Sequence, residues 1–185
     1  GPTAAGDVDE VELADVDGNT ESRQGTVSVF NGPDPRIEVC RDDDEEAATV
    51  AAWVSERRGE GLQPHEIGVF VRSVSQFARA RAAIEAAGQE PLEMREHFDS
   101  QSRHVSICTM HLAKGLEFRA VVVMACDDEV IPLQERIEVV ADDADLDEVY
   151  STERHLLYVA CTRARDHLLV TGVEPASEFL DDLCR

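Results

Sequence analysis

The sequence is short of positive charge, of aromatic residues and of long apolar runs. Its 185 residues include 17 Lys and Arg against 39 Asp and Glu, a formal net charge of −22, and 5% of them are aromatic. No apolar run approaches the roughly 20 residues of a membrane-spanning helix, and no signal-peptide pattern opens the chain. We therefore expect a soluble, cytoplasmic protein. So acidic a chain should be repelled by phosphate backbones, which argues against a nucleic-acid partner.

The distribution of the charge weakens that argument. Most of the excess lies in residues 7–17, in the five consecutive acids 42–46, and in residues 127–148, where ten acids face Arg136 alone. The rest of the chain holds 18 acids and 16 bases. Runs of like charge are usually solvated loops or tails. The alternative is an acidic docking surface for a protein partner, for which 127–148 is the candidate segment.

Cysteine usage gives no sign of a disulfide framework or a zinc site. The number of cysteines is odd, and no C-x-x-C spacing or paired His cluster accompanies them. Several lie inside apolar runs, which predicts reduced, buried thiols and no metal site. The residues are Cys40, Cys108, Cys126, Cys161 and Cys184.

Patterning along the chain predicts one α/β domain. Residues 1–25 lack sustained periodicity and are expected to form a mobile acidic leader, so the folded domain should span 26–185. Short apolar runs alternate there with helical patterns, which indicates a layered domain with a mainly parallel sheet. Ligands of such sheets gather at the carboxyl ends of the strands. The expected strands are 27–30, 36–40, 67–71, 105–109, 120–125 and 167–173; the expected helices are 42–58, 75–87, 152–162 and 175–183, with an acidic loop before the third helix.

Several catalytic motifs are absent. The chain has neither G-x-x-x-x-G-K-[ST] nor G-x-G-x-x-G, so it cannot cradle a triphosphate by itself. G-x-S-x-G, H-E-x-x-H and EF-hand patterns are missing too, which gives hydrolase and metal-site hypotheses little support.

Two polar segments remain. In 105–118, an apolar strand is followed within eight residues by His111, Lys114, Gly115 and Glu117. A polar cluster there suits ligand contact, with Gly115 permitting a tight turn, although an ordinary surface loop has the same composition. In 153–165, an amphipathic helix ends at Arg163. The helix dipole alone would satisfy a cation there, or the arginine could stabilise phosphoryl transfer on a neighbouring domain.

Together these segments resemble signature motifs of the UvrD/Rep/PcrA family of superfamily 1 DNA helicases. Residues 109–118, TMHLAKGLEF, resemble T-x-H-x-x-K-G-L-E-[FW], and 157–164, LYVACTRA, resemble the family's L-x-Y-V-[GA]-x-T-R-A. Residues 67–76 and 127–132 are similar to two further segments of that family. The resemblance covers roughly 26–183 and implies the second of two RecA-like motor domains, a three-layer α/β fold.

The resemblance implies a role for each matching residue. Arg163 would be the arginine finger directed at the γ-phosphate of ATP, which together with Mg²⁺ would be bound mainly by an N-terminal motor domain absent from this chain. Glu117, Lys114 and Gly115 would border the nucleotide from this side. The single-stranded DNA track would be contacted by Thr109, His111 and Arg72.

The sequence also departs from the family pattern. The large inserted subdomain expected between the Gly88 region and Val105 is missing, and Val74 stands where Asn is common.

From the resemblance we expect part of an ATP-dependent helicase that moves 3′ to 5′ on single-stranded DNA and is inactive alone, with the ATP-binding motor domain in the same polypeptide or in a separate subunit. The competing hypothesis is a degenerate helicase domain that acts as an acidic docking module.

Overall fold

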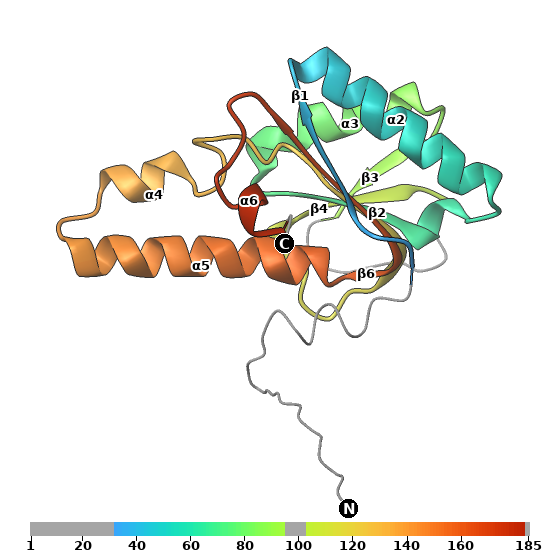
Figure 1. Ribbon diagram of the computed structural model, residues 1–185. Coiled ribbons are helices and arrows are strands. Elements are labelled where there is room, and N and C mark those ends of the chain that lie inside the picture. The colour runs from blue at the N-terminus through green and yellow to red at the C-terminus, as the bar shows by residue number, and fades with distance from the viewer. Residues whose placement is uncertain (1–31, 95–102, 184–185) are drawn as a thin grey trace, which may run out of the picture. The chain divides into compact units, whose positions relative to one another are not determined.

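The computed structural model describes residues 32–94 and 103–183, and all structural statements below concern these residues. Six parallel strands form one sheet in the order β1-β6-β5-β2-β4-β3, with helices on both faces (Figure 1). This is the RecA-like α/β architecture that the sequence predicts. The strands are β1 (Arg36–Cys40), β2 (Ile67–Val71), β3 (Pro91–Glu93), β4 (Val105–Thr109), β5 (Phe118–Val123) and β6 (Ala164–Val173).

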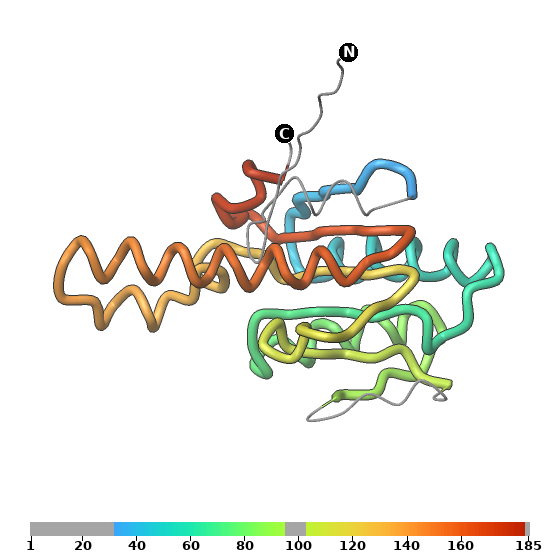
Figure 2. Tube along the Cα trace, turned by 90° about the horizontal axis from the view of Figure 1, so that it is seen from below, coloured from blue at the N-terminus to red at the C-terminus, as the bar shows by residue number. Residues whose placement is uncertain are grey.

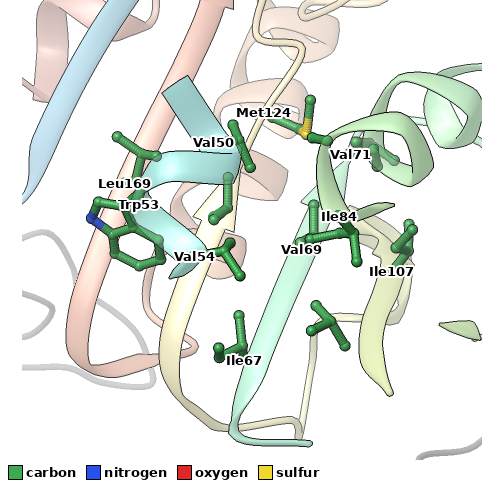
Figure 3. Close-up of a cluster of buried hydrophobic side chains, with 14 of the residues drawn as sticks. Val50, Trp53, Val54, Ile67, Val69, Val71, Ile84, Ile107, Met124 and Leu169 are labelled. Atoms are coloured by element: carbon green, nitrogen blue, oxygen red, sulfur yellow. The ribbon is translucent and has the colours of Figure 1, made fainter. Parts of the chain in front are cut away.

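Helices α2 (Asp43–Gly59) and α3 (Phe77–Ala86) cover one face of the sheet. Val50, Trp53 and Val54 of α2 and Ile84 of α3 meet alternate residues of the strands, such as Val69, in one apolar cluster (Figure 3). Burying a side chain of this size contributes about 1.5–3 kcal/mol. Because successive side chains of a strand point to opposite faces and both faces of the sheet are covered, every residue of β2 is buried. The strand therefore has a continuous apolar sequence.

The opposite face is covered by α5 (Asp143–Cys161), which packs on β5 and β6. Leu157, Ala160 and Cys161 are its buried apolar residues. The N-terminal part of α5 extends beyond the sheet, where the short helix α4 (Gln134–Glu138) runs beside it (Figures 1 and 2). No helix joins β4 to β5. Their connection is the 3₁₀ turn η4 (Met110–Leu112) and a loop, and η4 lies against α5.

Most predicted elements are confirmed. Strands 36–40, 67–71 and 105–109 have the predicted bounds, and α2 begins after Asp42, whose carboxylate accepts a hydrogen bond from the Glu45 backbone N–H at 2.8 Å. The predicted helix 75–87 forms as a 3₁₀ turn, η3 (Val74–Gln76), followed by α3. Predicted strand 27–30 and leader 1–25 lie outside the described residues.

The prediction that 127–148 is one acidic loop is wrong. Part of it forms α4, and α5 begins at Asp143 rather than at Thr152. The Asp142 carboxylate caps α5 by accepting a hydrogen bond from the Asp145 N–H at 2.9 Å. Acids in the first turn also favour the helix through its dipole, so here a run of acids starts a helix.

The closing helix is shorter than predicted. It does not start at Pro175, because residues 175–177 bond to the chain beyond β5: the Asp128 N–H donates to the Pro175 carbonyl at 2.8 Å, and the Ser177 N–H to the Cys126 carbonyl at 2.9 Å. Helix α6 spans only Leu180–Leu183. Strand β5 also lies two residues earlier than predicted, β6 starts at Ala164, and β3 was not predicted.

The thiol prediction is confirmed for the four cysteines within the described residues. Cys40, Cys108, Cys126 and Cys161 are free and buried, while Cys184 lies outside these residues. Burial raises the pKa of the Cys108 and Cys161 thiols to about 12. Among the described helices, none combines the length and apolar composition required to span a membrane.

Candidate nucleotide and nucleic-acid sites

The predicted site residues divide between two opposite edges of the sheet. Arg72 directly follows β2 and Thr109 ends the adjacent strand β4, with Val71 as the register partner of Thr109. These residues lie at the carboxyl edge, as expected for ligand contacts in a parallel sheet. His111 follows on η4.

Glu117 and Arg163 lie at the other edge. Glu117 directly precedes β5 and Arg163 directly precedes β6, and the Phe118 backbone N–H donates to the Arg163 carbonyl at 2.9 Å. The expectation that the polar residues after Thr109 form one cluster at the carboxyl end of a strand is therefore wrong for Glu117. The physical reason is the connection between β4 and β5, which has to return along the sheet before the next parallel strand can begin.

Arg163 is held by acceptors from α5 and from the loop before β5. Its Nε donates to the Val159 carbonyl at 3.1 Å, one terminal nitrogen to the Leu116 carbonyl at 3.2 Å, and the other to Thr162 Oγ1 at 2.9 Å. A guanidinium has five N–H groups, so one N–H on each terminal nitrogen is left over. Spare N–H donors of a guanidinium are suited to hydrogen-bond a phosphate or a carboxylate.

The charge of Arg163 is not neutralised locally. Within the described residues, none of its polar contacts is an ion pair with a carboxylate. Partial burial lowers the pKa of Arg163, and the negative charge of Glu117 opposes that shift. The guanidinium stays protonated at neutral pH because arginine starts from so high a pKa. A half-buried cation with two spare donors is a suitable partner for an external anion.

The loop from 113 to 117 places the other nucleotide-side candidates. Lys114, Gly115 and Glu117 are exposed, and Lys114 is the only lysine of the chain. Gly115 has a φ of +84°, a left-handed conformation that residues with a Cβ rarely adopt. The turn at Gly115 thus brings the Leu116 carbonyl to Arg163. The structure brings Glu117 and Arg163 together, while Lys114 has no contact with Arg163 in the described residues.

At the carboxyl edge, Arg72 is buried in a bidentate ion pair. Its Nε and a terminal nitrogen donate to the two carboxylate oxygens of Glu153 at 2.8 and 2.7 Å, and only 5% and 0% of these two side chains are exposed. Losing one partner of a buried pair costs about 3–5 kcal/mol because the other charge is left unpaired. In this conformation Arg72, the predicted DNA contact, is committed to Glu153 and screened from solvent.

Glu153 accepts two further hydrogen bonds. The Leu133 backbone N–H donates to it at 2.9 Å, and Arg136 donates at 2.8 Å. Burial alone would raise the pKa of Glu153, but the hydrogen bonds from Arg72, Arg136 and Leu133 outweigh it and lower the pKa. Arg136 differs from Arg72 in that 39% of its side chain is exposed, so water can solvate its guanidinium if it leaves Glu153.

His111 is exposed beside this ion-pair cluster, and Thr109 is half-buried. Partial burial and the positive charge of Arg72 lower the pKa of His111, with Arg136 adding to the effect and Glu153 opposing it. The imidazole is therefore neutral at pH 7 and can donate one hydrogen bond. Arg72, Thr109 and His111 thus lie at one edge of the sheet.

A second buried carboxylate belongs to the fold. Glu46 of α2 is fully buried, and it accepts hydrogen bonds from Arg79, from the Ala125 N–H at 2.8 Å and from the Thr171 hydroxyl at 2.7 Å. Arg79 also pairs with Asp127 at 2.7 Å. These contacts all lie within the domain, so the network joins α2 and α3 to the ends of β5 and β6.

Sequence reasoning gave no role to Glu153, Arg136 or Thr162. Glu153 lies four residues before Leu157 and seven before Ala160, so it belongs to the buried stripe of α5, and that spacing could have identified it. Thr162 hydrogen-bonds both to the Val159 carbonyl, at 2.7 Å, and to Arg163, and so orients the arginine.

Comparison with known proteins relates part of the chain to one protein family. Residues 89–174 match the family described as "UvrD-like helicase C-terminal domain". This part of the chain is therefore similar to that domain. The match spans both polar segments, with the 109–118 and 157–164 motifs inside it, so the resemblance found from the motifs is confirmed.

Relatives of the UvrD-like domain include named helicases. The chain is 30% identical over 90 residues to the ATP-dependent DNA helicase PcrA of Bacillus subtilis, covering 49% of this chain and 11% of that protein. It is 35% identical over 77 residues to DNA helicase II of Rickettsia typhi, covering 42% of this chain and 11% of that one. The chain thus spans about a tenth of the length of such curated relatives.

A solved structure shares the fold. The crystal structure of the C-terminal domain of a possible DNA helicase from Lactobacillus plantarum WCFS1 matches with a TM-score of 0.58 and 21% sequence identity. The match covers 84% of this chain and 85% of that one. The likeness therefore extends over nearly the whole described domain of this chain, beyond the matched 89–174.

Proposed function

We propose that this chain is the second motor domain of an ATP-dependent UvrD-like DNA helicase, and that Arg163 completes an ATP site on a separate N-terminal motor domain. The observation that carries the proposal is the state of Arg163. Its guanidinium is half-buried, is oriented by three neutral acceptors, and keeps one free N–H on each terminal nitrogen. An arginine held in this way costs little to reorganise when it meets a γ-phosphate.

Each residue would have a defined task in that enzyme. Arg163 would stabilise the charge that develops on the transferred phosphoryl group, and Thr162 would hold its orientation. Glu117 would border the ribose, with Lys114 and Gly115 shaping the loop. Mg²⁺, which neutralises the β- and γ-oxygens in such sites, would be held with ATP by the other motor domain. This chain has no phosphate-cradling loop of its own.

The opposite edge would face the single-stranded DNA. Thr109 ends β4 and His111 follows it, and the short loop after them leads to Leu116, whose carbonyl accepts a hydrogen bond from Arg163. DNA at one edge and nucleotide at the other would thus be linked through one loop. Closing and opening of the cleft between the motor domains would then move the enzyme along the strand, in the 3′ to 5′ direction that the family implies.

Reconstitution with the ATP-binding motor domain tests this proposal. The chain alone should show no ATP hydrolysis, whereas the mixture should hydrolyse ATP in a manner stimulated by single-stranded DNA. Arg163→Ala should reduce that rate by about 10³-fold or more, the effect of removing an arginine finger. Arg165→Ala is the matched control, because Arg165 lies two residues away, is exposed and pairs with Asp166.

Two outcomes would count against the proposal. One is appreciable hydrolysis by the isolated chain that disappears on Arg163→Ala. The other is a reconstituted rate that falls equally in the Arg163 and Arg165 variants. The isolated chain should also bind single-stranded DNA only weakly, because its net charge of −22 opposes phosphates, and tight binding in a low-salt gel shift would contradict this.

A docking module is the second candidate function. The pair of helices α4 and α5 extends beyond the sheet, its first turns are acidic, and Val139 between the helices is 81% exposed. A pure docking module has no need of an oriented Arg163. Reconstituted ATPase activity that depends on Arg163 would therefore decide for the motor domain.

A further inference from the structure

Three charged side chains meet where β2 ends, and they are unequal in their access to solvent. Glu153 is fully buried and binds Arg72 through both carboxylate oxygens, while Arg136 reaches the same carboxylate from α4. The side chain of Arg72 is 5% exposed and that of Arg136 is 39% exposed. Two cations share one carboxylate, so the cluster keeps one positive charge, and its accessible part is Arg136.

The two arginines also differ in what their departure would leave behind. If Arg136 turned outward, Glu153 would keep both bonds from Arg72 and the bond from the Leu133 N–H. If Arg72 left, a buried carboxylate would lose its bidentate partner, which is the unfavourable case. Arg136 can therefore be shared with an external anion, whereas Arg72 is fixed.

The surroundings of Arg136 fit a phosphate-bearing strand. His111 lies close enough to the cluster for its pKa to respond to Arg72, Glu153 and Arg136, and it is exposed. Arg136 also donates to the Thr152 hydroxyl at 3.1 Å, which fixes the direction of its guanidinium. It is the only base within the acidic segment 127–148, so a phosphate at this part of the edge has no other cation of that segment to pair with.

We propose that Arg136, assisted by His111, is the phosphate contact at the carboxyl edge, and that Arg72 is a positioning residue that holds Glu153. The ligand is a backbone phosphodiester of single-stranded DNA. The inference rests on the proposed function, which places the DNA at this edge and the nucleotide at the other. It differs from the resemblance, which assigns the phosphate contact to Arg72.

The test is a titration of the full 185-residue chain with oligo-dT of about eight nucleotides, a length within the usual range of single-strand sites, followed by ¹H–¹⁵N NMR. At roughly 20 mM salt, weak binding should shift signals of Arg136 and His111, since electrostatic contacts strengthen at low salt. Arg136→Ala should weaken binding about 3- to 10-fold and lower the salt slope by about 0.7, the value for one single-strand phosphate. Arg136→Lys should restore most of the slope.

Arg154→Ala is the matched control. Its side chain has the same 39% exposure, lies on α5 and pairs with Asp182, so its loss changes the net charge equally. Equal weakening by the two variants would overturn the inference and leave the proposed function standing, and so would wild-type affinity in Arg136→Ala. No dT-induced shift at all would overturn the inference together with the DNA half of the proposed function, while the ATPase reconstitution would still report on Arg163.

A second arm separates the two sources of phosphate. ATP and inorganic pyrophosphate are titrated under the same conditions as the oligonucleotide. Shifts at Arg136 as large as those caused by oligo-dT would show a general phosphate site and would overturn the assignment to DNA. Shifts confined to dT, with Arg163 unaffected by it, would support the division between the two edges.

Discussion

Replacing Glu153 by Gln tests whether one buried carboxylate holds the carboxyl edge together. The amide keeps the size of the side chain but removes its charge, and its nitrogen cannot accept the hydrogen bonds that Glu153 takes. Arg72 would then be a nearly buried cation with no counterion in place. Because its side chain is 5% exposed, water cannot replace the lost partner without local opening.

The expected loss is about 3–5 kcal/mol at pH 7, the usual result of removing one partner from a buried pair. Domains of this size commonly have about 5–15 kcal/mol of stability, so the variant should be severely weakened but measurable. Urea unfolding followed by circular dichroism gives the value. With a slope of about 2 kcal/mol per molar urea, the midpoint should fall by roughly 1.5–2.5 M.

The pH dependence gives an independent check. The pKa of Glu153 is lower in the folded chain than its ordinary value near 4.5, so its ionised form favours the folded state. The contribution is complete above that ordinary value and is lost as the pH falls through the lower, folded-state pKa. The difference in free energy of unfolding between wild type and Glu153→Gln should therefore become smaller as the pH falls into the acid range.

Two controls make the result decisive. Glu148→Gln removes an exposed carboxylate from the same helix and should change stability by less than about 0.5 kcal/mol. Arg136→Ala removes the partly exposed partner of Glu153, which keeps its hydrogen bonds from Arg72 and Leu133, so the loss should be about 1–2 kcal/mol and smaller than in Glu153→Gln. A loss below about 1 kcal/mol in Glu153→Gln, or an equal loss in Arg136→Ala, would refute the reasoning.

Further predictions concern other parts of the domain. Gly115→Ala should lower stability by about 1 kcal/mol in thermal unfolding because its φ is +84°, whereas Gly59→Ala, with no such φ and no atom within 4 Å of the new Cβ, should be neutral or stabilising. Iodoacetamide at pH 8 should leave Cys108 and Cys161 unmodified in peptide mass spectra of the native chain, and labelling at the unfolded rate would contradict their burial. Glu46→Gln should destabilise the domain by about 2–4 kcal/mol in urea unfolding, since it leaves Arg79 without its buried partner; a loss under 1 kcal/mol would argue against the network.

Strands and helices were predictable where local pattern and burial agree. The apolar runs at Ile67–Val71 and Val105–Thr109 became interior strands with the predicted bounds, because a strand covered on both faces has to be apolar throughout. Strand β3 has only three residues and starts with a proline, so it carries too little pattern to be recognised. The early start of α5 was missed because its acids were read as a loop, although acids at a helix N-terminus stabilise it.

The identity of the candidate site residues could be predicted better than their arrangement in space. Motif matching identified Arg163, Glu117 and His111, but it could not show that two of them lie at one edge of the sheet and the third at the other. That division depends on a helix-free return from β4 to β5, which no local signal specifies. The burial of two acids could partly be predicted. Glu46 and Glu153 each lie on a helical stripe with buried apolar residues, and a carboxylate is buried there only when it is paired and hydrogen-bonded.

The course of α5 sets limits on how the chain can vary in length. Glu153 lies within α5, which ends at Cys161, two residues before Arg163, so the helix fixes the direction of Arg163 relative to Glu153. Inserting or deleting one residue between them would turn Arg163 by about 100° around the helix axis and take it away from the Leu116 carbonyl. The part of α5 before Glu153 projects past the sheet, so length changes there leave both edges undisturbed (Figure 2). Natural or engineered insertions should therefore collect in the turn between α4 and α5, residues 139–142, and avoid the ten residues that follow Glu153.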